Sequence, residues 1–135
     1  MVSIFIVGGS SFAGDRVTDV FNIAISNDDK ILVAFSAGLA KYNAEGVRAT
    51  DFGRNGLIRN DWIGYMKTDD QGRIYTFHKY WGPLVRYTAT GKIDESFGNQ
   101  GKVPTRGPHK VSAVVPTFDG KVLVGEDIET DNGYT

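Results

Sequence analysis

The chain repeats itself with a period of about 45 residues, and this repeat restricts its possible folds more than any other feature. Two elements recur at an offset of 45 residues: segment 51–58 returns as 96–103, and segment 39–46 returns as 84–91. A third element, at offsets of 43 and 48, occurs three times, as 28–33, 71–76 and 119–124. The elements keep one order, so each copy is a supersecondary unit that buries its apolar surface against neighbouring copies.

Each unit is predicted to contain four short β-strands. In the first unit, large apolar residues alternate along 21–26, which is typical of a strand with one buried face. Segment 31–35 is apolar throughout, which indicates a strand covered on both faces, and the turn cluster before it predicts a hairpin. A third strand is expected at 39–43; alanines there also permit a short helix, but Val and Thr in the matching segment 84–90 favour a strand. We expect a fourth short strand that leads into the Phe-Gly-x-x-Gly motif.

The composition agrees with a β-protein of one domain. Val and Ile number 23 against only 7 Leu and Met, which favours strands over helices. The 17 glycines supply the residues that tight turns require. In the motif, glycines are expected to take backbone angles that other residues disfavour, and Phe52 and Phe97 are expected to fill the space between units. Four short strands in each repeat of about this length are the signature of a β-propeller blade, so we predict an all-β, propeller-like fold.

The predicted single domain, residues 1–135, divides into two whole units and two half-units. The half-units are 1–17 and about 106–135, and the whole, four-stranded blades are about 18–59 and 60–105. Segment 3–7 takes the place of a third strand, so the two half-blades together make a third blade. Three blades are fewer than the four to eight usual in propellers, and a two-fold dimer would supply six. We therefore expect closure by oligomerisation, with 3–7 pairing with the blade begun by 111–125 of another chain; the alternative is an open stack that contacts a different partner.

Three segments resemble the delta-60 repeat family. They are Phe-Gly-x-x-Gly-Lys-Val at 97–103, Asp-Gly-Lys-Val-Leu-Val-Gly at 119–125, and Arg-Tyr-x-x-x-Gly-x-x-Asp at 86–94. The first unit departs from the family pattern at Asp29, where the family usually has Gly. The resemblance extends over nearly the whole chain and implies a propeller-like β-fold. It implies no reaction, because such repeats are scaffolds and a fold does not determine a function.

Charge and composition argue against several classes of partner. Fifteen Lys and Arg against sixteen Asp and Glu give a net charge of −1, so no basic excess is available for nucleic acid. The absence of cysteine excludes disulfides and thiolate zinc sites. The apolar stretch 4–7 lacks the preceding basic residues and the length of about 7–15 residues expected of a signal peptide, and no run suits a transmembrane helix. We expect no nucleic-acid or membrane partner and no cofactor, and the localisation stays open.

Six residues are candidate binding residues. Residues 74 and 84 are ten positions apart, whereas their counterparts 31 and 39 are eight apart, so the second unit has a longer loop between its second and third strands. Tyr, Trp and a cation in one loop are typical of a binding hot spot, although these rings could also fill an interface between blades. Two further candidates fall just before the first strand of their units, which lines the channel of a propeller. The complete set is Trp62, His78, Lys79, Tyr80, Trp81 and Lys110.

The sequence predicts no catalytic residue and no metal ligand. His78 and His109 are neither close in sequence nor at equivalent positions of the repeat, and no serine stands in a Gly-x-Ser-x-Gly setting. We therefore expect a non-enzymatic structural, assembly or protein-binding module, which could belong to a larger particle such as a phage virion or tail. The alternative is a propeller hydrolase or lyase, which would gather His and carboxylate side chains around the central channel.

Overall fold

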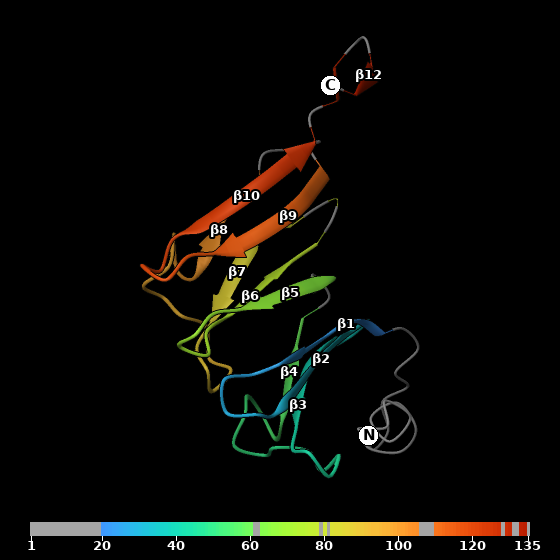
Figure 1. Cartoon of the computed structure of the whole chain (residues 1–135), viewed down its shortest axis with the longest axis vertical. Helices are drawn as coiled ribbons and strands as arrows, with labels where there is room; N and C mark the ends of the chain where they lie inside the picture. Colours follow the sequence, from blue (N-terminus) through green and yellow to red (C-terminus); the bar gives the residue numbers. More distant parts are fainter. Residues whose placement is uncertain are drawn as a thin grey trace.

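The structure is a computed structural model, and it describes residues 20–60, 63–78, 80, 82–105, 110–127, 129–130 and 133–134. These residues form an all-β arrangement of antiparallel sheets with no helix, so the prediction of an all-β protein is confirmed (Figure 1). None of the sheets formed by these residues closes on itself. Within the same residues, no helix is long and apolar enough to cross a membrane.

Two four-stranded sheets and one two-stranded sheet make up most of the structure. The first sheet contains β1 (Val20–Ile25), β2 (Ile31–Phe35), β3 (Gly38–Tyr42) and β4 (Leu57–Arg59). The second contains β5 (Tyr65–Thr68), β6 (Ile74–Phe77), β7 (Leu84–Tyr87) and β8 (Lys102–Val103). The third pairs β9 (Lys110–Pro116) with β10 (Val122–Asp127), and a short ladder joins β11 (Glu129–Thr130) to β12 (Gly133–Tyr134).

The hairpin turns between the first two strands are the same in all three sheets. In each turn the first residue donates its N–H to the carbonyl four residues further on, at 2.8 Å for Ser26, 3.1 Å for Asp69 and 2.9 Å for Thr117. The fourth residue has a positive φ, which is 76° at Gly72 and 82° at Gly120. In the first turn Asp29 takes this conformation with φ 58°. The departure from Gly at this position therefore leaves the turn unchanged but places a side chain in a left-handed conformation.

The prediction that a fourth strand leads into the Phe-Gly-x-x-Gly motif was wrong, because β4 and β8 follow the motif. After β3 the chain makes a turn at Asn43, whose side-chain oxygen accepts hydrogen bonds from two backbone N–H groups. The motif is itself a tight loop in which Gly56 donates its N–H to the carbonyl of Phe52. Gly53 and Gly98 both have φ 55°, and a methyl group on Gly53 would lie 2.6 Å from a backbone oxygen. The motif thus reverses the chain before the fourth strand begins.

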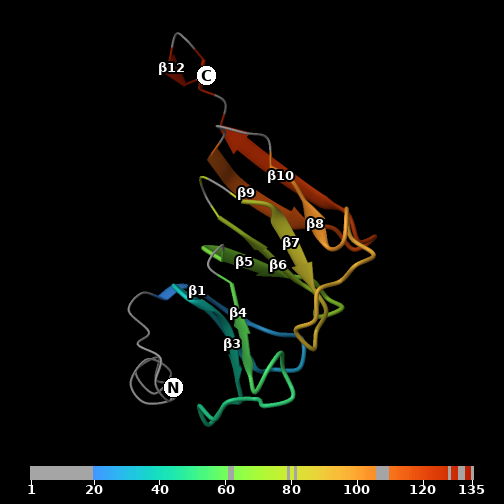
Figure 2. The ribbon, with the colours of Figure 1, turned by 180° about the vertical axis from the view of Figure 1, so that it is seen from behind.

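The three sheets lie one after another, with β1, β5 and β9 side by side (Figures 1 and 2). A buried cluster joins the first sheet to the second, and Phe52 belongs to it together with Leu32 and Met66. A second cluster joins the second sheet to the third, with Tyr75 and Val114 as members and Phe97 packed against it. Strands β2 and β6 are buried at every position, as the apolar pattern of 31–35 predicts for the first of them.

Candidate functional site

The loop predicted to bind a partner lies between β6 and β7, because β6 ends at Phe77 and β7 begins at Leu84. The structure describes His78 and Tyr80 in this loop. The other predicted loop residues, Lys79 and Trp81, lie outside the described residues, and so does Trp62. The binding roles assigned to those three side chains therefore stay predictions.

His78 and Tyr80 are brought together at the start of the loop. The backbone N–H of Tyr80 donates to Nδ1 of His78 at 3.3 Å, and the two rings are tilted with their centroids 6.3 Å apart. Burial lowers the pKa of His78 below its usual value of 6.5, so the imidazole is neutral near pH 7. A neutral ring with Nδ1 as acceptor carries its proton on Nε2. Tyr80 is 58% exposed.

Lys110 is the first residue of β9, and the register places it opposite Asp127 of β10. Its Nζ lies 3.8 Å from Oδ2 of Asp127, and both side chains are partly exposed. An ion pair in such a setting contributes about 0–1 kcal/mol. The structure thus gives Lys110 a partner within its own sheet, and its predicted role in binding stays a prediction.

A groove follows the first strands of the sheets and was not identified from the sequence. It encloses about 350 Å³ between β1, β5 and β9. Tyr65 and Phe77 stack within it, with ring centroids 5.6 Å apart and an interplanar angle of 24°. Its described lining contains Lys67 as a cation but no carboxylate or imidazole. This surface can accommodate apolar or aromatic groups. The only indication of it in the sequence was the repeated first strand of each unit, which lines the channel of a propeller.

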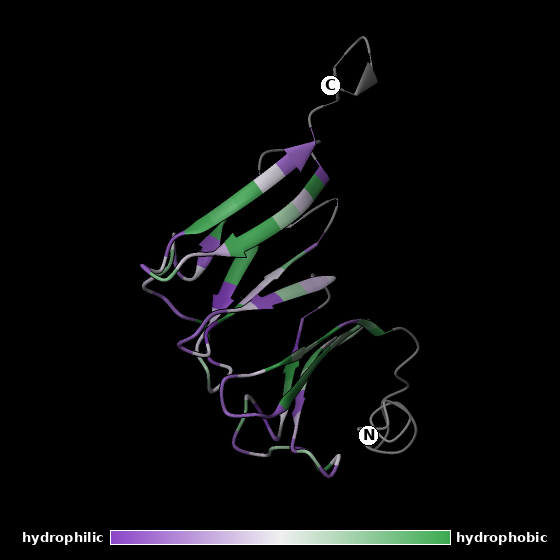
Figure 3. Ribbon diagram, viewed as in Figure 1, coloured by the Kyte–Doolittle hydropathy of each residue, from purple (hydrophilic) through white to green (hydrophobic). Residues whose placement is uncertain are grey.

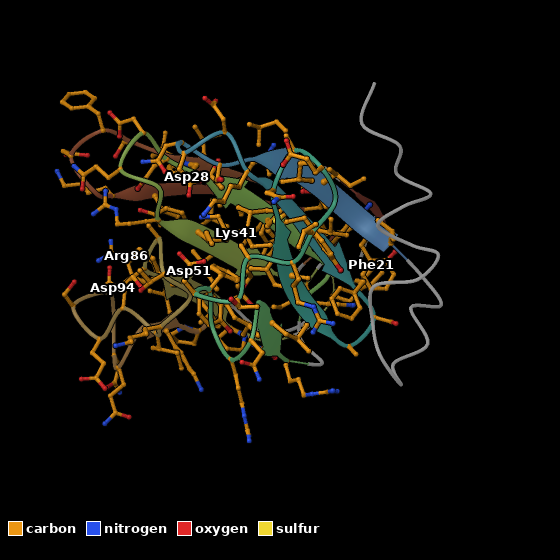
Figure 4. The ribbon with its side chains drawn as sticks, turned by 90° about the horizontal axis from the view of Figure 1, so that it is seen from below. Phe21, Asp28, Lys41, Asp51, Arg86 and Asp94 are labelled. Carbon is orange, nitrogen blue, oxygen red and sulfur yellow. The ribbon has the colours of Figure 1, made fainter. Side chains whose placement is uncertain are left out.

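Two buried cations, Lys41 and Arg86, lie beside the hairpin turns of the sheets (Figure 4). Lys41 and Arg86 hold equivalent positions in the repeat, and each is 5% exposed. Lys41 Nζ lies 3.1 Å from Oδ2 of Asp28 and 5.5 Å from the centre of the Phe52 ring. Sequence reasoning missed both cations, although the repeated third strand, with Lys in one copy and Arg in the next, was a signal for them.

Arg86 connects the second sheet to the third. Its Nε lies 2.8 Å from Oδ2 of Asp94, and one terminal nitrogen donates to the Ser96 hydroxyl at 2.9 Å. The other terminal nitrogen donates to the carbonyl of Gly120, in the hairpin turn of the third sheet, at 3.2 Å. The guanidinium also lies over the Phe97 ring, 4.6 Å from its centre. These contacts make Arg86 a structural residue that aligns neighbouring units.

The carboxylates beside these cations have lowered pKa values. Burial raises the pKa of Asp28, but the hydrogen bond from Ser26 and the hydrogen bond and charge of Lys41 outweigh it and bring the pKa to about 2. The pKa of Asp94 is lowered, mainly by its hydrogen bond with Ser96 and also by Arg86. Both carboxylates are therefore ionised at neutral pH and are unsuited to act as general acids there.

The edge strand β1 of the first sheet and the outward face of the third sheet expose apolar side chains. Strands β1 and β2 at one end of the stack, and β9 and β10 at the other, carry hydrophobic residues (Figure 3). On β1, Ile23 and Ile25 are 37% and 60% exposed. On the third sheet, Val115 and Leu123 face each other in register and are 54% and 65% exposed. Large apolar side chains grouped in this way are typical of surfaces that contact another protein.

The described residues contain no group of three or more His, Cys, Asp or Glu side chains able to hold a metal ion. No family model, no curated protein and no solved structure matches the chain. The resemblance to the delta-60 repeat family therefore stays a prediction, and the function has to be argued from the surfaces of the molecule.

Proposed function

We propose that the chain is a non-enzymatic, β-propeller-like repeat module that acts in assembly or protein binding. The observation that carries this proposal is the exposure of large apolar side chains on the edge strand β1 of the first sheet and on the outward face of the third sheet. We call these the β1 face, with Phe21, Ile23 and Ile25, and the β10 face, with Val115 and Leu123. The β10 face lies away from the second sheet. In the first sheet the exposed side chains are those of the edge strand β1, because Ile31 and Val33 of β2, their partners in register, are buried.

The size of these faces is appropriate for association. Complete burial of one Val, Leu, Ile or Phe side chain stabilises a complex by about 1.5–3 kcal/mol. Five side chains that are roughly half exposed therefore contribute about 5 kcal/mol when a partner covers all of them. Association itself costs about 4–15 kcal/mol in lost translational and rotational freedom. The contribution of these five side chains therefore lies near the lower limit of the cost of association.

The repeated architecture supports the propeller-like part of the proposal. The three hairpin turns share one hydrogen-bonding pattern, and the first strand of each sheet lies beside the first strand of the next. That is the arrangement of inner strands around the channel of a propeller. The described lining of the groove along these strands contains apolar groups, Lys67 and the uncharged polar residues Asn22 and Ser112, which favours a binding module over a hydrolase or lyase. An assembly role of this kind suits a component of a larger particle, such as a phage virion or tail.

The proposal is tested by placing a charge on each face. We expect Ile25→Asp and Leu123→Asp each to reduce the association of the chain, measured by sedimentation velocity. If the chain does not associate, we expect each variant to bind less of an apolar fluorescent dye than the wild type does. The matched control is Val47→Asp, because Val47 is 60% exposed and its repeat equivalent, Lys92, is exposed as well. Circular dichroism verifies that each variant is folded. If both face variants associate and bind dye like the wild type, the faces are not contact surfaces and the proposal is wrong.

A further inference from the structure

We propose that the groove between β1, β5 and β9 is a binding site for a small aromatic anion, such as a planar ring that carries a carboxylate. The proposal is carried by the Tyr65 ring and the Lys67 ammonium group, which both line this groove. It goes beyond the proposed function, because a site for a small molecule does not depend on contacts at the β1 face or the β10 face.

The second unit places two side chains in the groove that the other units lack. Counting back from the hairpin turn, the registers align the first strands of the three sheets residue by residue. The equivalent residues are Asn22 and Ala113 for Tyr65, and Ala24 and Val115 for Lys67. The same strand therefore forms without an aromatic ring at the first position and without a cation at the second. The fold requires neither group, which favours a role for both in binding.

The aromatic part of the site is held in place from below. Tyr65 pairs with Phe77 in register, and the two rings stack with their centroids 5.6 Å apart, within the range of favourable aromatic pairs. Phe77 is 6% exposed, whereas Tyr65 is 39% exposed. Val111 and Val114 are buried in one cluster with Phe77 and form an apolar wall on the third sheet. The Tyr65 ring is thus fixed on one side and open to a second planar ring.

The charge of the site favours an anion. Lys67 stands two residues after Tyr65 on β5, so both side chains lie on one face of the strand. The described lining holds no carboxylate that could neutralise the lysine. Its uncharged polar residues, Asn22 and Ser112, can both donate hydrogen bonds. A carboxylate would therefore meet a positive charge and hydrogen-bond donors, whereas an organic cation would be repelled.

The dimensions of the groove limit the size of the ligand. Its volume of about 350 Å³ lies at the lower end of the range for small-molecule sites, about 300–1,000 Å³. The Cα atoms of Tyr65 and Lys67 are about 7 Å apart, because each strand residue advances about 3.3 Å. A ligand of one or two fused rings can therefore stack on Tyr65 and direct its carboxylate toward the Lys67 ammonium group.

The proposal is tested by titrating the isotope-labelled chain with naphthoate and following the backbone amide signals by nuclear magnetic resonance. Naphthamide, which has the same rings but no charge, is the matched ligand. We expect naphthoate to shift the signals of β5 and β9 around the groove. We also expect naphthoate to bind at least about threefold more tightly than naphthamide, because an exposed ion pair with Lys67 is added.

Variants separate the two parts of the site. Tyr65→Asn introduces the residue of the first unit and should weaken both ligands about 5- to 10-fold, because the stacking is lost. Tyr65→Leu, which keeps an apolar side chain, gives the same test if Tyr65→Asn does not fold by circular dichroism. Lys67→Met should remove the preference for naphthoate and leave naphthamide binding unchanged. The control is Lys92→Met, because Lys92 is exposed and is outside the described lining of the groove.

Three results would overturn the proposal. The first is no binding of naphthoate at millimolar concentration, and the second is equal affinity of the wild type for naphthoate and naphthamide. The third is binding that Leu123→Ser abolishes and Tyr65→Asn leaves unchanged, because the probe would then occupy the β10 face. None of these results alters the association measured with Ile25→Asp and Leu123→Asp, so the proposed function stands or fails separately.

Discussion

Phe52 and Phe97 occupy the same place in the repeated motif, yet the structure predicts that their removal has unequal effects. From the sequence alone, substitution of either residue by alanine would destabilise the protein by about 3–5 kcal/mol. In the structure Phe52 is 1% exposed and lies in the cluster that joins the first two sheets. Phe97 is only partly buried and lies at the margin of the cluster that joins the second and third sheets.

The expected magnitudes follow from these environments. Phe52→Ala removes a completely buried ring and leaves an enclosed cavity, so the free energy of unfolding should fall by about 3–5 kcal/mol. Phe97→Ala leaves a cavity open to solvent. The free energy of unfolding should therefore fall only by the contribution of the apolar surface that the ring buries, about 1.5–2.5 kcal/mol. The contact with the Arg86 guanidinium, 4.6 Å from the Phe97 ring centre, adds about 0.5–1 kcal/mol. We therefore expect Phe52→Ala to be more destabilising by about 1 kcal/mol, the difference between the midpoints of the two ranges.

Urea unfolding followed by far-ultraviolet circular dichroism measures this difference, with all variants at one protein concentration because association would affect stability. Phe52→Leu and Phe97→Leu serve as controls that keep an apolar side chain at each site. An effect of Phe97→Ala equal to or greater than that of Phe52→Ala would contradict the unequal burial. A nearly neutral Phe52→Ala would contradict the packing of the first sheet on the second.

Two further predictions concern the hairpin turns. Asp29→Gly should raise the free energy of unfolding by about 0.5–1 kcal/mol, because relief of the left-handed strain exceeds the entropy gained by the unfolded chain, and a lower urea midpoint would contradict this. The pKa of Asp28 is lowered from 3.8 to about 2 in the folded state. The ionised carboxylate therefore stabilises the fold at pH values above the pKa of the unfolded chain, and this stabilisation is lost as the pH falls toward 2. The urea midpoint of the wild type should therefore fall more than that of Asp28→Asn between pH 5 and about 2; parallel curves for the two proteins would show that the carboxylate is not stabilised by folding.

Local chemistry made much of the architecture predictable from the sequence. The fully apolar run 31–35 predicts a strand buried on both faces, and β2 is buried at every position. Asp119 and Gly120 between two apolar runs predict a hairpin, and Gly120 has the positive φ that such a turn requires. These features depend on residues that are neighbours along the chain, so the pattern of side chains alone is sufficient to specify them. The loop between β6 and β7 was likewise evident from the spacing of the repeat.

The tertiary structure decided the features that depend on what lies next to a residue in space. The pattern of a third strand does not reveal that Lys41 and Arg86 are buried, because their stabilisation comes from carboxylates on separate turns. Equivalence in the repeat suggests that Ile23 and Met66 are alike, yet one is exposed and the other buried. A strand's own sequence specifies which of its faces is apolar. Whether a side chain on that face is covered depends on what packs against it in space: Ile23 is exposed on the edge strand of the first sheet, whereas Val33, its partner in register, is buried.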